Sequence, residues 1–402
     1  MNVAVISPQS SHWEDAHRVA SILVKAFQRL GHKAWLITSI YHDDQLAVKA
    51  EIVEKSEKGY VEVENDVSGV PTIRVLSSRP IFQPNIVFRN FVGVLNEIDK
   101  QYDLDVIVVF SSFWNGPEEV AKWIGVRKSL LSIGEISKRA TFVFVPIYTT
   151  KIPISRPIEA TFRVMWSTFQ LPEILRNTDL IVVCCRSEAE ELKPYRVPSE
   201  KIIESRCWID PDFADLIPSV DKLRHVENFD FYVSYIGPLD EDRNLRGLVK
   251  TAEKLSSIGN IGLVVAGSGS AKERFKREIR GVKNLVLLEE YDMRTVASVM
   301  KWSLVGMDLS YFEPFGIRAL EYLYAGVPFA TSPTSRAVWH ITNGVDGIHL
   351  EGPEDINGLV NWISTLIRDP ELREEIGVKA RRKAEGLNAV KLAELIISKA
   401  QR

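Results

Sequence analysis

Short apolar runs alternate with amphipathic helical patterns along the first half of the chain. Asn2–Ser7 is such a run, and the segment after it places apolar side chains on one helical face before Gly31. Uninterrupted apolar runs of this length suit parallel strands that are covered on both faces. We therefore expect the chain to open as strand, helix, strand. Further strands are predicted at Ala34–Thr38, Val106–Phe110, Thr141–Pro146 and Leu180–Cys185, and residues 50–77 are predicted as a strand or hairpin.

The alternation begins again after an irregular polar stretch. Residues 208–228 interrupt the pattern, and we interpret them as a connection between domains. Strand-like runs follow at Phe231–Ile236, Ile261–Ala266, Leu285–Leu288, Leu304–Met307 and Pro328–Thr331, and residues 370–402 show a helical pattern. The sequence therefore predicts an α/β protein of two doubly wound, Rossmann-like domains, residues 1–207 and 229–384.

Composition says more about the partners and cellular location of the protein than about its chemistry. The 402 residues carry a net charge of −3, which gives no global attraction to nucleic acid, and we expect none as a partner. Three cysteines cannot form a disulfide framework, and Met1–Ser7 lacks the basic start and small cleavage-site residues of a signal peptide, so we expect none. No apolar run approaches the ~18 residues that span a bilayer. These features favour a cytoplasmic protein, with the inner membrane surface as an alternative location.

The segment Tyr311–Gly326 carries the strongest candidate chemistry. It leaves a predicted strand, turns at Pro314, and enters a helix that ends at Gly326. Proline suits a first helical turn, and the free N–H groups of Phe315, Gly316 and Ile317 would face an anion or a hydroxyl-rich ligand. Glu313 and Glu321 would flank this helix start. The alternative is that Glu313 only caps the helix and that Glu321 is a solvated helix residue.

Two further turns follow predicted strands of the same domain. Gly237 precedes Arg243, whose guanidinium could clamp a diphosphate, or could simply pair with Asp240 or Asp242. Gly267 and Gly269 form a second turn, which could approach a phosphate or serve only as a structural strand-to-helix connection. Ligands bind at this edge of open α/β sheets.

Taken together, these motifs resemble glycosyltransferase family 4, which has the two-domain GT-B fold and retains anomeric configuration. The family motif of two glutamates separated by seven residues matches Glu313 and Glu321, with Phe315-Gly316 and Ala325-Gly-Val-Pro328 beside them. The resemblance runs in order from about Tyr235 to Leu350. It implies a retaining glycosyltransferase, and a C-terminal helix, about residues 385–402, that packs back on the first domain.

The resemblance also implies a role for each matched residue. Glu313 would bind the hydroxyls of the transferred sugar, Glu321 the ribose, and Arg243 the diphosphate, while Leu288–Tyr291 would border the base. His12, in the loop after the first strand, could orient the acceptor or a phosphate, or could be a surface histidine. The substrates implied are a UDP-, GDP- or ADP-sugar and a glycan, glycolipid or other hydroxyl acceptor. No additional cofactor and no metal are implied.

The chain departs from the family pattern around the phosphates and on the acceptor side. Pro238 stands where the family has an arginine, and Gln9–Trp13 replaces the glycine pair of the first loop. These changes keep a second hypothesis open, a catalytically silent relative that binds a nucleotide sugar or a partner. An epimerase or phosphorylase of the same fold fits the acid spacing less well.

Two weaker patterns have competing interpretations. Asp103-Leu-Asp105 imitates a metal-binding acid pair but precedes a strand, at the wrong edge of a parallel sheet. The segments 79–91 and 156–169 interleave arginine with bulky apolar residues. They suit either core helices with arginines at the rim, which we favour, or peripheral contact with a membrane or a lipid-linked acceptor.

Overall fold

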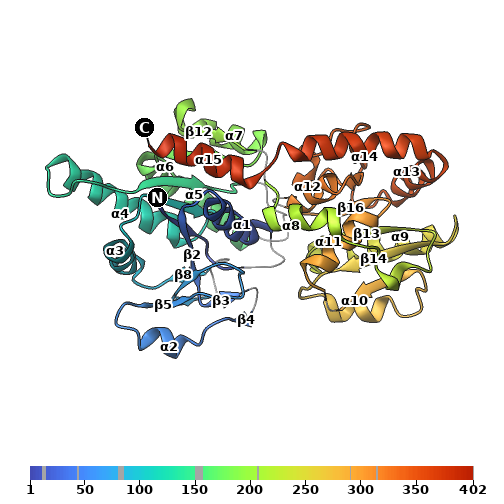
Figure 1. Cartoon of the computed structure of the whole chain (residues 1–402), viewed down its shortest axis with the longest axis horizontal. Helices are drawn as coiled ribbons and strands as arrows, with labels where there is room; N and C mark the ends of the chain where they lie inside the picture. Colours follow the sequence, from blue (N-terminus) through green and yellow to red (C-terminus); the bar gives the residue numbers. More distant parts are fainter. Residues whose placement is uncertain are drawn as a thin grey trace. The chain divides into compact units, whose positions relative to one another are not determined.

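The structure is a computed structural model that describes residues 1–10, 15–42, 45–79, 86–149, 157–205, 208–289, 291–313 and 316–401. The chain divides into two compact units (Figure 1). The first comprises Met1–Arg206 together with Ala389–Arg402, and the second comprises Cys207–Asn388. Residues 208–228, interpreted from the sequence as a connection, therefore lie within the second unit.

The first unit is built on an eight-stranded sheet that is parallel except at one edge, where β5 runs antiparallel to β6. Its strand order is β12 (Ile202–Glu204), β11 (Leu180–Val183), β10 (Thr141–Val145), β9 (Val106–Phe110), β1 (Asn2–Ile6), β2 (Lys33–Ser39), β6 (Thr72–Val75) and β5 (Tyr60–Val63). Two small antiparallel pairs join β3 (Tyr41–His42) to β4 (Gln45–Leu46) and β7 (Ser77–Ser78) to β8 (Val87–Phe88). The strands predicted from apolar runs are confirmed in this unit.

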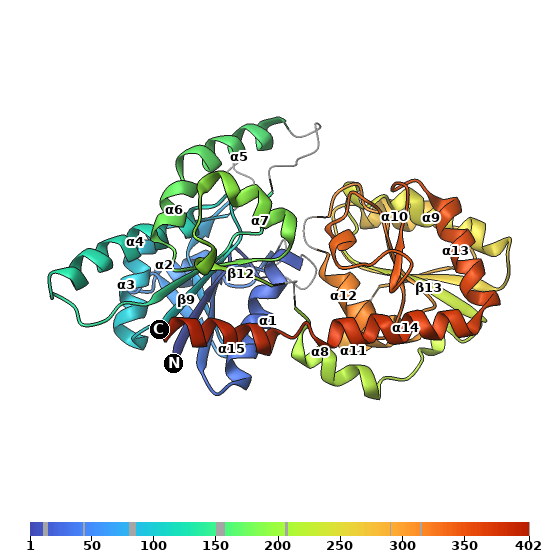
Figure 2. The ribbon, with the colours of Figure 1, turned by 90° about the horizontal axis from the view of Figure 1, so that it is seen from above.

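Helices cover both faces of this sheet, as continuous apolar strands require. They are α1 (Asp15–Arg29), α2 (Ala50–Glu54), α3 (Phe91–Tyr102), α4 (Asn115–Ser132), α5 (Pro157–Phe169), α6 (Leu171–Asn177), α7 (Arg186–Leu192) and α15 (Ala389–Ala400). The last of these comes from the C-terminal end of the chain and packs beside α1 (Figure 2). Strands and helices enclose an aromatic-rich core that includes Phe91, Trp114 and Phe144.

The second unit contains a six-stranded sheet, and all its strand pairs are parallel. The order is β15 (Leu285–Leu288), β14 (Ile261–Ala266), β13 (Phe231–Ile236), β16 (Gly306–Asp308), β17 (Phe329–Thr331) and β18 (Gly347–His349). The first three match the predicted bounds. β16 starts two residues later than predicted and ends at Asp308, and β18 was not among the predicted strands.

The helices of this unit are α8 (Pro211–Leu216), α9 (Leu245–Ser256), α10 (Lys272–Glu278), α11 (Met293–Trp302), α12 (Ile317–Tyr324), α13 (Ile356–Arg368) and α14 (Pro370–Glu385). The predicted helical stretch 370–402 is interrupted after Glu385, so α14 belongs to the second unit and α15 to the first. Short 3-10 turns occur at 193–195, 199–201, 217–219, 224–226, 241–243 and 336–339. Among the described residues, no helix combines the length and apolar character needed to cross a membrane.

Candidate functional site

The candidate site lies at the carboxyl edge of the second sheet. Numbered along the chain, its strand order is 3-2-1-4-5-6, and the order reverses between β13 and β16. Open α/β sheets bind ligands at such a switch point because the loops after the two strands leave in opposite directions. Arg243 lies in the loop after β13 and Glu313 in the loop after β16. The topology therefore brings together the two residues predicted to carry most of the chemistry.

The loop after β13 is tightly joined to the loop after β14. Gly237 N–H donates to Ala266 O at 3.0 Å, and Leu239 N–H donates to Ser268 O at 2.9 Å. A Cβ atom on Gly267 would lie 1.9 Å from Gly237 O, and one on Gly269 would lie 2.6 Å from Leu239 O. Both glycines are thus required by the close approach of two backbone segments. This supports the structural interpretation of that turn.

Asp240 belongs to this loop pair and not to the arginine. Its Oδ1 accepts hydrogen bonds from the N–H and the hydroxyl of Ser270, both at 2.7 Å. The proposed alternative in which Arg243 pairs with Asp240 is therefore wrong. Arg243 has Asp242 as a secondary partner, with Nε 3.5 Å from Oδ1.

The principal partner of Arg243 is Glu313. The Arg243 Nη1 group donates to Glu313 Oε2, and the two side chains are only 12% and 10% exposed. Tyr311 N–H donates to Asp242 O at 2.8 Å, which ties the two loops together beside the pair. Burial opposes the charge of Arg243, but Glu313 and the nearby acids outweigh it and raise the pKa of the guanidinium. The cation is therefore permanently charged and already oriented.

Glu313 also contacts the start of α12. Its Oε1 accepts from Gly316 N–H at 3.1 Å, so the capping interpretation describes part of its role. The helix begins at Ile317, directly after Gly316. Gly316 has φ +73°, and a Cβ there would lie 2.5 Å from Ala337 N. Pro314 and Phe315 lie outside the described residues.

Glu321 is fully buried one turn further along α12. Arg318 Nη1 donates to its Oε2 at 2.8 Å, and Arg318 is itself only 11% exposed. The alternative of a solvated Glu321 is therefore wrong. A buried carboxylate with an arginine partner is a fixed feature of the helix rather than a surface residue.

The remaining predicted residues divide between the described and undescribed parts of the chain. Tyr291 follows β15 at the same carboxyl edge and is half-buried, two strands from β13. His12 falls outside the described residues.

Asp308 is a further residue of this site, and it was not predicted from the sequence. It ends β16, is buried, and its Oδ1 accepts from Ser310 N–H at 2.9 Å. Burial, and after it the charge of Glu313, raises the pKa of Asp308. An acid that directly follows an apolar strand-like run at the ligand edge of the sheet is the signal that could have identified it.

We expect Asp308→Asn to stabilise the protein at neutral pH and to have little effect near pH 4. The pKa of Asp308 in the folded protein lies above its value of about 3.9 in the unfolded chain. The stability that protonated Asp308 contributes is therefore fully present below about pH 3.9. It is lost as pH rises through the folded pKa. Each pKa unit corresponds to about 1.4 kcal/mol. Urea unfolding of both proteins at pH 4 and pH 8 measures the difference, and an equal difference at the two pH values would contradict the prediction.

Solved structures with this architecture cover nearly the whole chain. Sucrose-phosphate synthase from Thermosynechococcus elongatus is 17% identical with a TM-score of 0.68, covering 99% of this chain and 98% of that one. The Anabaena protein HepE in complex with UDP-glucose is 15% identical with a TM-score of 0.64, covering 100% and 99%. The chain has the GT-B fold.

The sequence similarity to known families lies mainly in the second unit, which carries the candidate site. The family described as "Glycosyl transferases group 1" matches residues 221–383. A capsular polysaccharide biosynthesis glycosyltransferase of Staphylococcus aureus is 26% identical over 41% of this chain and 44% of its own length. Glycogen synthase of Mycobacterium tuberculosis is 23% identical over 52% and 50%. The chain thus spans half or less of the length of these curated relatives.

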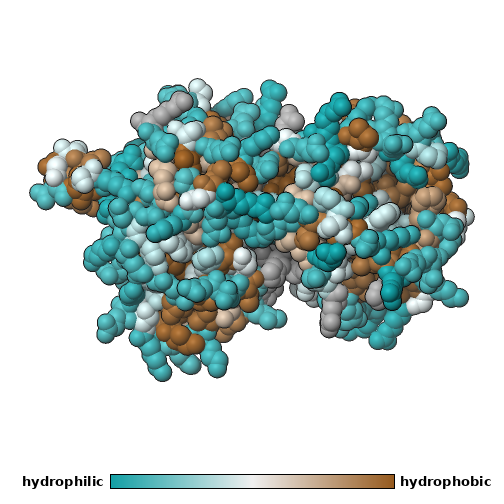
Figure 3. Space-filling view, in the orientation of Figure 1, coloured by the Kyte–Doolittle hydropathy of each residue, from teal (hydrophilic) through white to brown (hydrophobic). Residues whose placement is uncertain are grey.

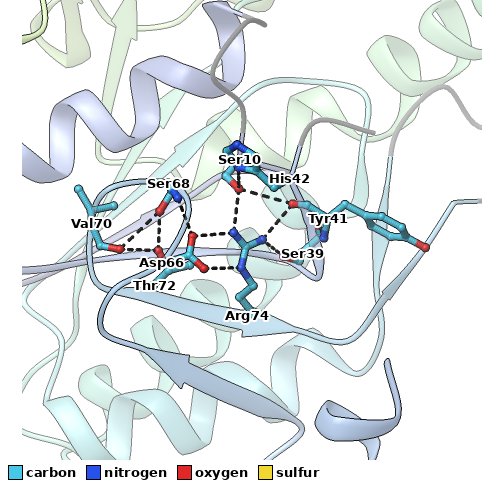
Figure 4. Close-up of polar contacts among 9 residues, drawn as sticks. All are labelled: Ser10, Ser39, Tyr41, His42, Asp66, Ser68, Val70, Thr72 and Arg74. Atoms are coloured by element: carbon cyan, nitrogen blue, oxygen red, sulfur yellow. Dashed lines mark hydrogen bonds and ion pairs between the residues drawn. The ribbon is translucent and has the colours of Figure 1, made fainter. Parts of the chain in front are cut away.

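The first unit has a buried ion pair near the carboxyl ends of β1 and β2 (Figure 4). Arg74, on β6, donates from Nε and Nη2 to both carboxylate oxygens of Asp66, at 2.7 and 2.6 Å. Its other N–H groups reach Ser39 O, Tyr41 O and Ser10 Oγ, at 2.8, 3.0 and 3.0 Å. All five guanidinium donors are thereby satisfied. This network was not predicted from the sequence, and it anchors Ser10.

Ser10 is held from two sides. Its hydroxyl lies 2.8 Å from His42 Nδ1 and 3.5 Å from Tyr41 O, while Arg74 donates to the same oxygen. The Ser10 hydroxyl is therefore shared among the side chains of His42 and Arg74 and the backbone of Tyr41.

An apolar cavity of about 250 Å³ opens between α4 and α5. Trp114, Phe162 and Trp166 line it, and its acids and amides are largely engaged within the protein. Trp166 Nε1 donates to Glu118 at 2.6 Å, and Asn115 bonds both the N–H and the O of Phe88, at 3.0 and 2.9 Å. Burial raises the pKa of Glu118. The cavity is suited to an apolar group more than to a charged one.

Asp103 and Asp105, the acid pair that imitates a metal site, both form ion pairs with one lysine. Lys138 Nζ lies 3.0 Å from Asp103 Oδ2 and 2.7 Å from Asp105 Oδ1, and both acids precede β9 at the amino edge of the sheet. Asp105 also accepts from Asn2 N–H at 2.7 Å. Within the described ranges, no group of three or more potential metal ligands occurs.

Proposed function

We propose that this protein is a retaining glycosyltransferase that transfers a sugar from a nucleotide-sugar donor to a hydroxyl acceptor. The observation that carries the proposal is the Arg243–Glu313 pair at the switch point of the second sheet. The pair lies inside the segment that matches glycosyl transferases group 1. A fixed cation and a carboxylate at one ligand edge are the two groups that a sugar diphosphate requires.

Donor binding would proceed through an exchange of partners. A diphosphate at the carboxyl edge would compete with Glu313 for the Arg243 guanidinium, which can form bidentate bonds with phosphate. Glu313, released from Arg243, would then accept hydrogen bonds from the sugar hydroxyls. Arg243 would stabilise the negative charge that develops on the leaving diphosphate. The anomeric configuration would be retained, as the family resemblance implies.

The other predicted residues would fix the nucleotide. Glu321, held in place by Arg318, would bind the ribose, and Tyr291 after β15 would border the base. The loop pair at Gly237, Gly267 and Gly269 would bring backbone close to the diphosphate. Solved structures of this fold bind UDP-glucose in one case and ADP in another, so uridine, guanosine and adenosine donors all remain in the proposal.

The acceptor would bind on the first unit. The apolar cavity beside α5 favours a glycolipid or other amphiphilic acceptor over a free charged sugar, and Ile158, Val164, Met165 and Phe169 of α5 are all exposed. A hydrophobic patch also lies over β4 and α2 of this unit, where Leu46 and Ile52 are exposed (Figure 3). Such surfaces suit peripheral contact with the inner face of a membrane.

A panel of UDP-, GDP- and ADP-sugars is expected to give one strong thermal shift. A donor present at about 100 times its Kd stabilises the folded protein by about 2.7 kcal/mol, which raises the melting temperature by several degrees. The shift is expected to disappear in Arg243→Gln and to persist in Glu354→Gln, an exposed acid of the same unit. No shift with any donor would contradict the donor site.

The same panel, followed by a hydrolysis assay, separates the rival hypothesis. Pro238 and the altered first loop motivate the hypothesis of a silent relative that binds a nucleotide sugar without transfer. Binding with slow hydrolysis or transfer supports the enzyme, whereas binding without any turnover supports the silent relative.

A further inference from the structure

A second cavity lies at the opposite, amino edge of the second sheet. Its volume is about 560 Å³, within the range typical of small-molecule sites, and its walls include the residues just before β16 and β17. Three arginines of α14 and a lysine at the end of α11 line it, with two glutamates: Lys301, Arg373, Arg381, Arg382, Glu374 and Glu385. The lining therefore carries four positive and two negative charges.

Two of the four cations are used by the fold. Lys301 Nζ donates to Pro218 O and Val220 O, at 3.1 and 3.2 Å. Arg381 donates to Tyr324 O at the C-terminal end of α12, and its Nε lies 2.8 Å from Glu385 Oε1. Basic side chains commonly satisfy the carbonyl ends of helices in this way. The roles of Lys301 and Arg381 in the cavity wall are therefore accounted for by these contacts within the protein.

Arg373 and Arg382 have no such explanation. Within the described residues, neither guanidinium takes part in a hydrogen bond or an ion pair, although two glutamates line the same cavity. Arg373 only lies over the Phe231 ring, 5.5 Å from its centroid. Arginine presents a planar fork of donors that matches phosphate oxygens, so two unpaired guanidiniums beside one cavity are complementary to that group.

The walls of the cavity are held rigidly. α14 packs against α12 and the turn after it, and a Cβ on Gly377 would lie only 2.6 Å from Gly326 O. Gly326 itself has φ +76°, which favours glycine. The arginines of α14 are therefore presented from a backbone that is packed closely against α12 and the turn after it.

We propose that this cavity is a second binding site, which takes a phosphate-bearing anion through Arg373 and Arg382. It lies at the amino edge of the sheet, whereas Arg243 and Glu313 lie at the carboxyl edge. It is therefore separate from the donor site and does not depend on the proposed transferase activity. The phosphate could be that of a free phosphorylated metabolite or that of an anionic lipid headgroup, because the same guanidinium chemistry recognises both.

The test compares two double variants by isothermal titration with inorganic phosphate, at constant ionic strength. Arg373→Gln/Arg382→Gln removes the unpaired guanidiniums. Arg277→Gln/Arg280→Gln is the matched control, since it removes two exposed arginines elsewhere on the unit and changes the net charge equally. We expect saturable binding to the native protein, at least tenfold weaker binding to the first variant, and unchanged binding to the control. Phosphate that also enters the donor site would bind all three proteins alike.

A second arm uses vesicles that contain phosphatidic acid. Phosphate binding that depends on the two arginines assigns the site to a free anion, while vesicle binding with the same dependence assigns it to a headgroup. Binding of neither probe, or equal loss of binding in the two double variants, would overturn the proposal. Failure of the nucleotide-sugar panel would leave it untouched, because the site residues are different.

Discussion

Replacing Glu313 by glutamine is expected to lower turnover about 10²–10³-fold while the protein remains folded. Glutamine keeps the shape of the side chain and an oxygen that can accept from Gly316 N–H. It removes the charge that orients Arg243 and, in our proposal, the strong acceptor for the sugar hydroxyls. The measurement is steady-state transfer or hydrolysis of the nucleotide sugar that stabilises the native protein most.

Arg243→Gln is expected to lower turnover as strongly, but also to destabilise the second unit. It leaves Glu313, Asp242 and buried Asp308 close together without their cation, and breaking a buried pair costs about 3–5 kcal/mol. The double variant Arg243→Gln/Glu313→Gln is therefore expected to regain part of the stability but none of the turnover. That combination separates a chemical role from a structural one.

Glu354→Gln is the matched control for both variants. Glu354 accepts from the Tyr311 hydroxyl in the same loop region, is half exposed, and is not a partner of Arg243. Native turnover in this control, together with reduced turnover in Glu313→Gln, places the effect at the pair. Turnover near the native rate in Glu313→Gln would instead remove Glu313 from the proposed chemistry.

The strands were predictable because their signal is local. β9, β13, β14 and β15 have the predicted bounds, since a parallel strand covered on both faces must be apolar along its length. The meeting of Arg243 and Glu313 was predictable in outline, because loops after neighbouring parallel strands share one edge. Which acid would pair with the arginine was not, because three acids lie within reach of it in sequence or space.

The errors arise where tertiary packing decides. The left-handed conformation of Gly316 before α12 was not predictable, because it accompanies a close approach to the backbone of Ala337, a residue distant in sequence. Glu321 was given a solvated alternative because a glutamate on a helix is usually exposed, whereas this one is buried with Arg318 as its partner. Arg74 lies in a four-residue strand. The residues next to it in sequence do not indicate that five hydrogen-bond acceptor atoms from other segments will surround its guanidinium.

That buried network leads to the largest stability effect we expect in the first unit. Arg74→Met should lower the free energy of unfolding by about 3–5 kcal/mol at pH 7, because it strands the Asp66 carboxylate and three further acceptors in the interior. Arg74→Met/Asp66→Asn should recover part of this loss by removing the unpaired charge. Hydrogen exchange of the full chain, read separately on peptides of each unit, locates the effect in the first unit.

The pH dependence provides a signature that a simple packing defect would lack. Burial alone would raise the pKa of Asp66, but its bonds to Arg74 and Ser68 outweigh burial and lower it. In the native protein this stability is therefore present above the unfolded value of about 3.9 and is lost as pH falls through the lowered folded pKa. In Arg74→Met the unpaired, buried carboxyl favours its proton. The difference in free energy of unfolding between the two proteins should shrink towards pH 3, and a constant difference from pH 3 to pH 7 would show that lost packing, not charge, causes the destabilisation.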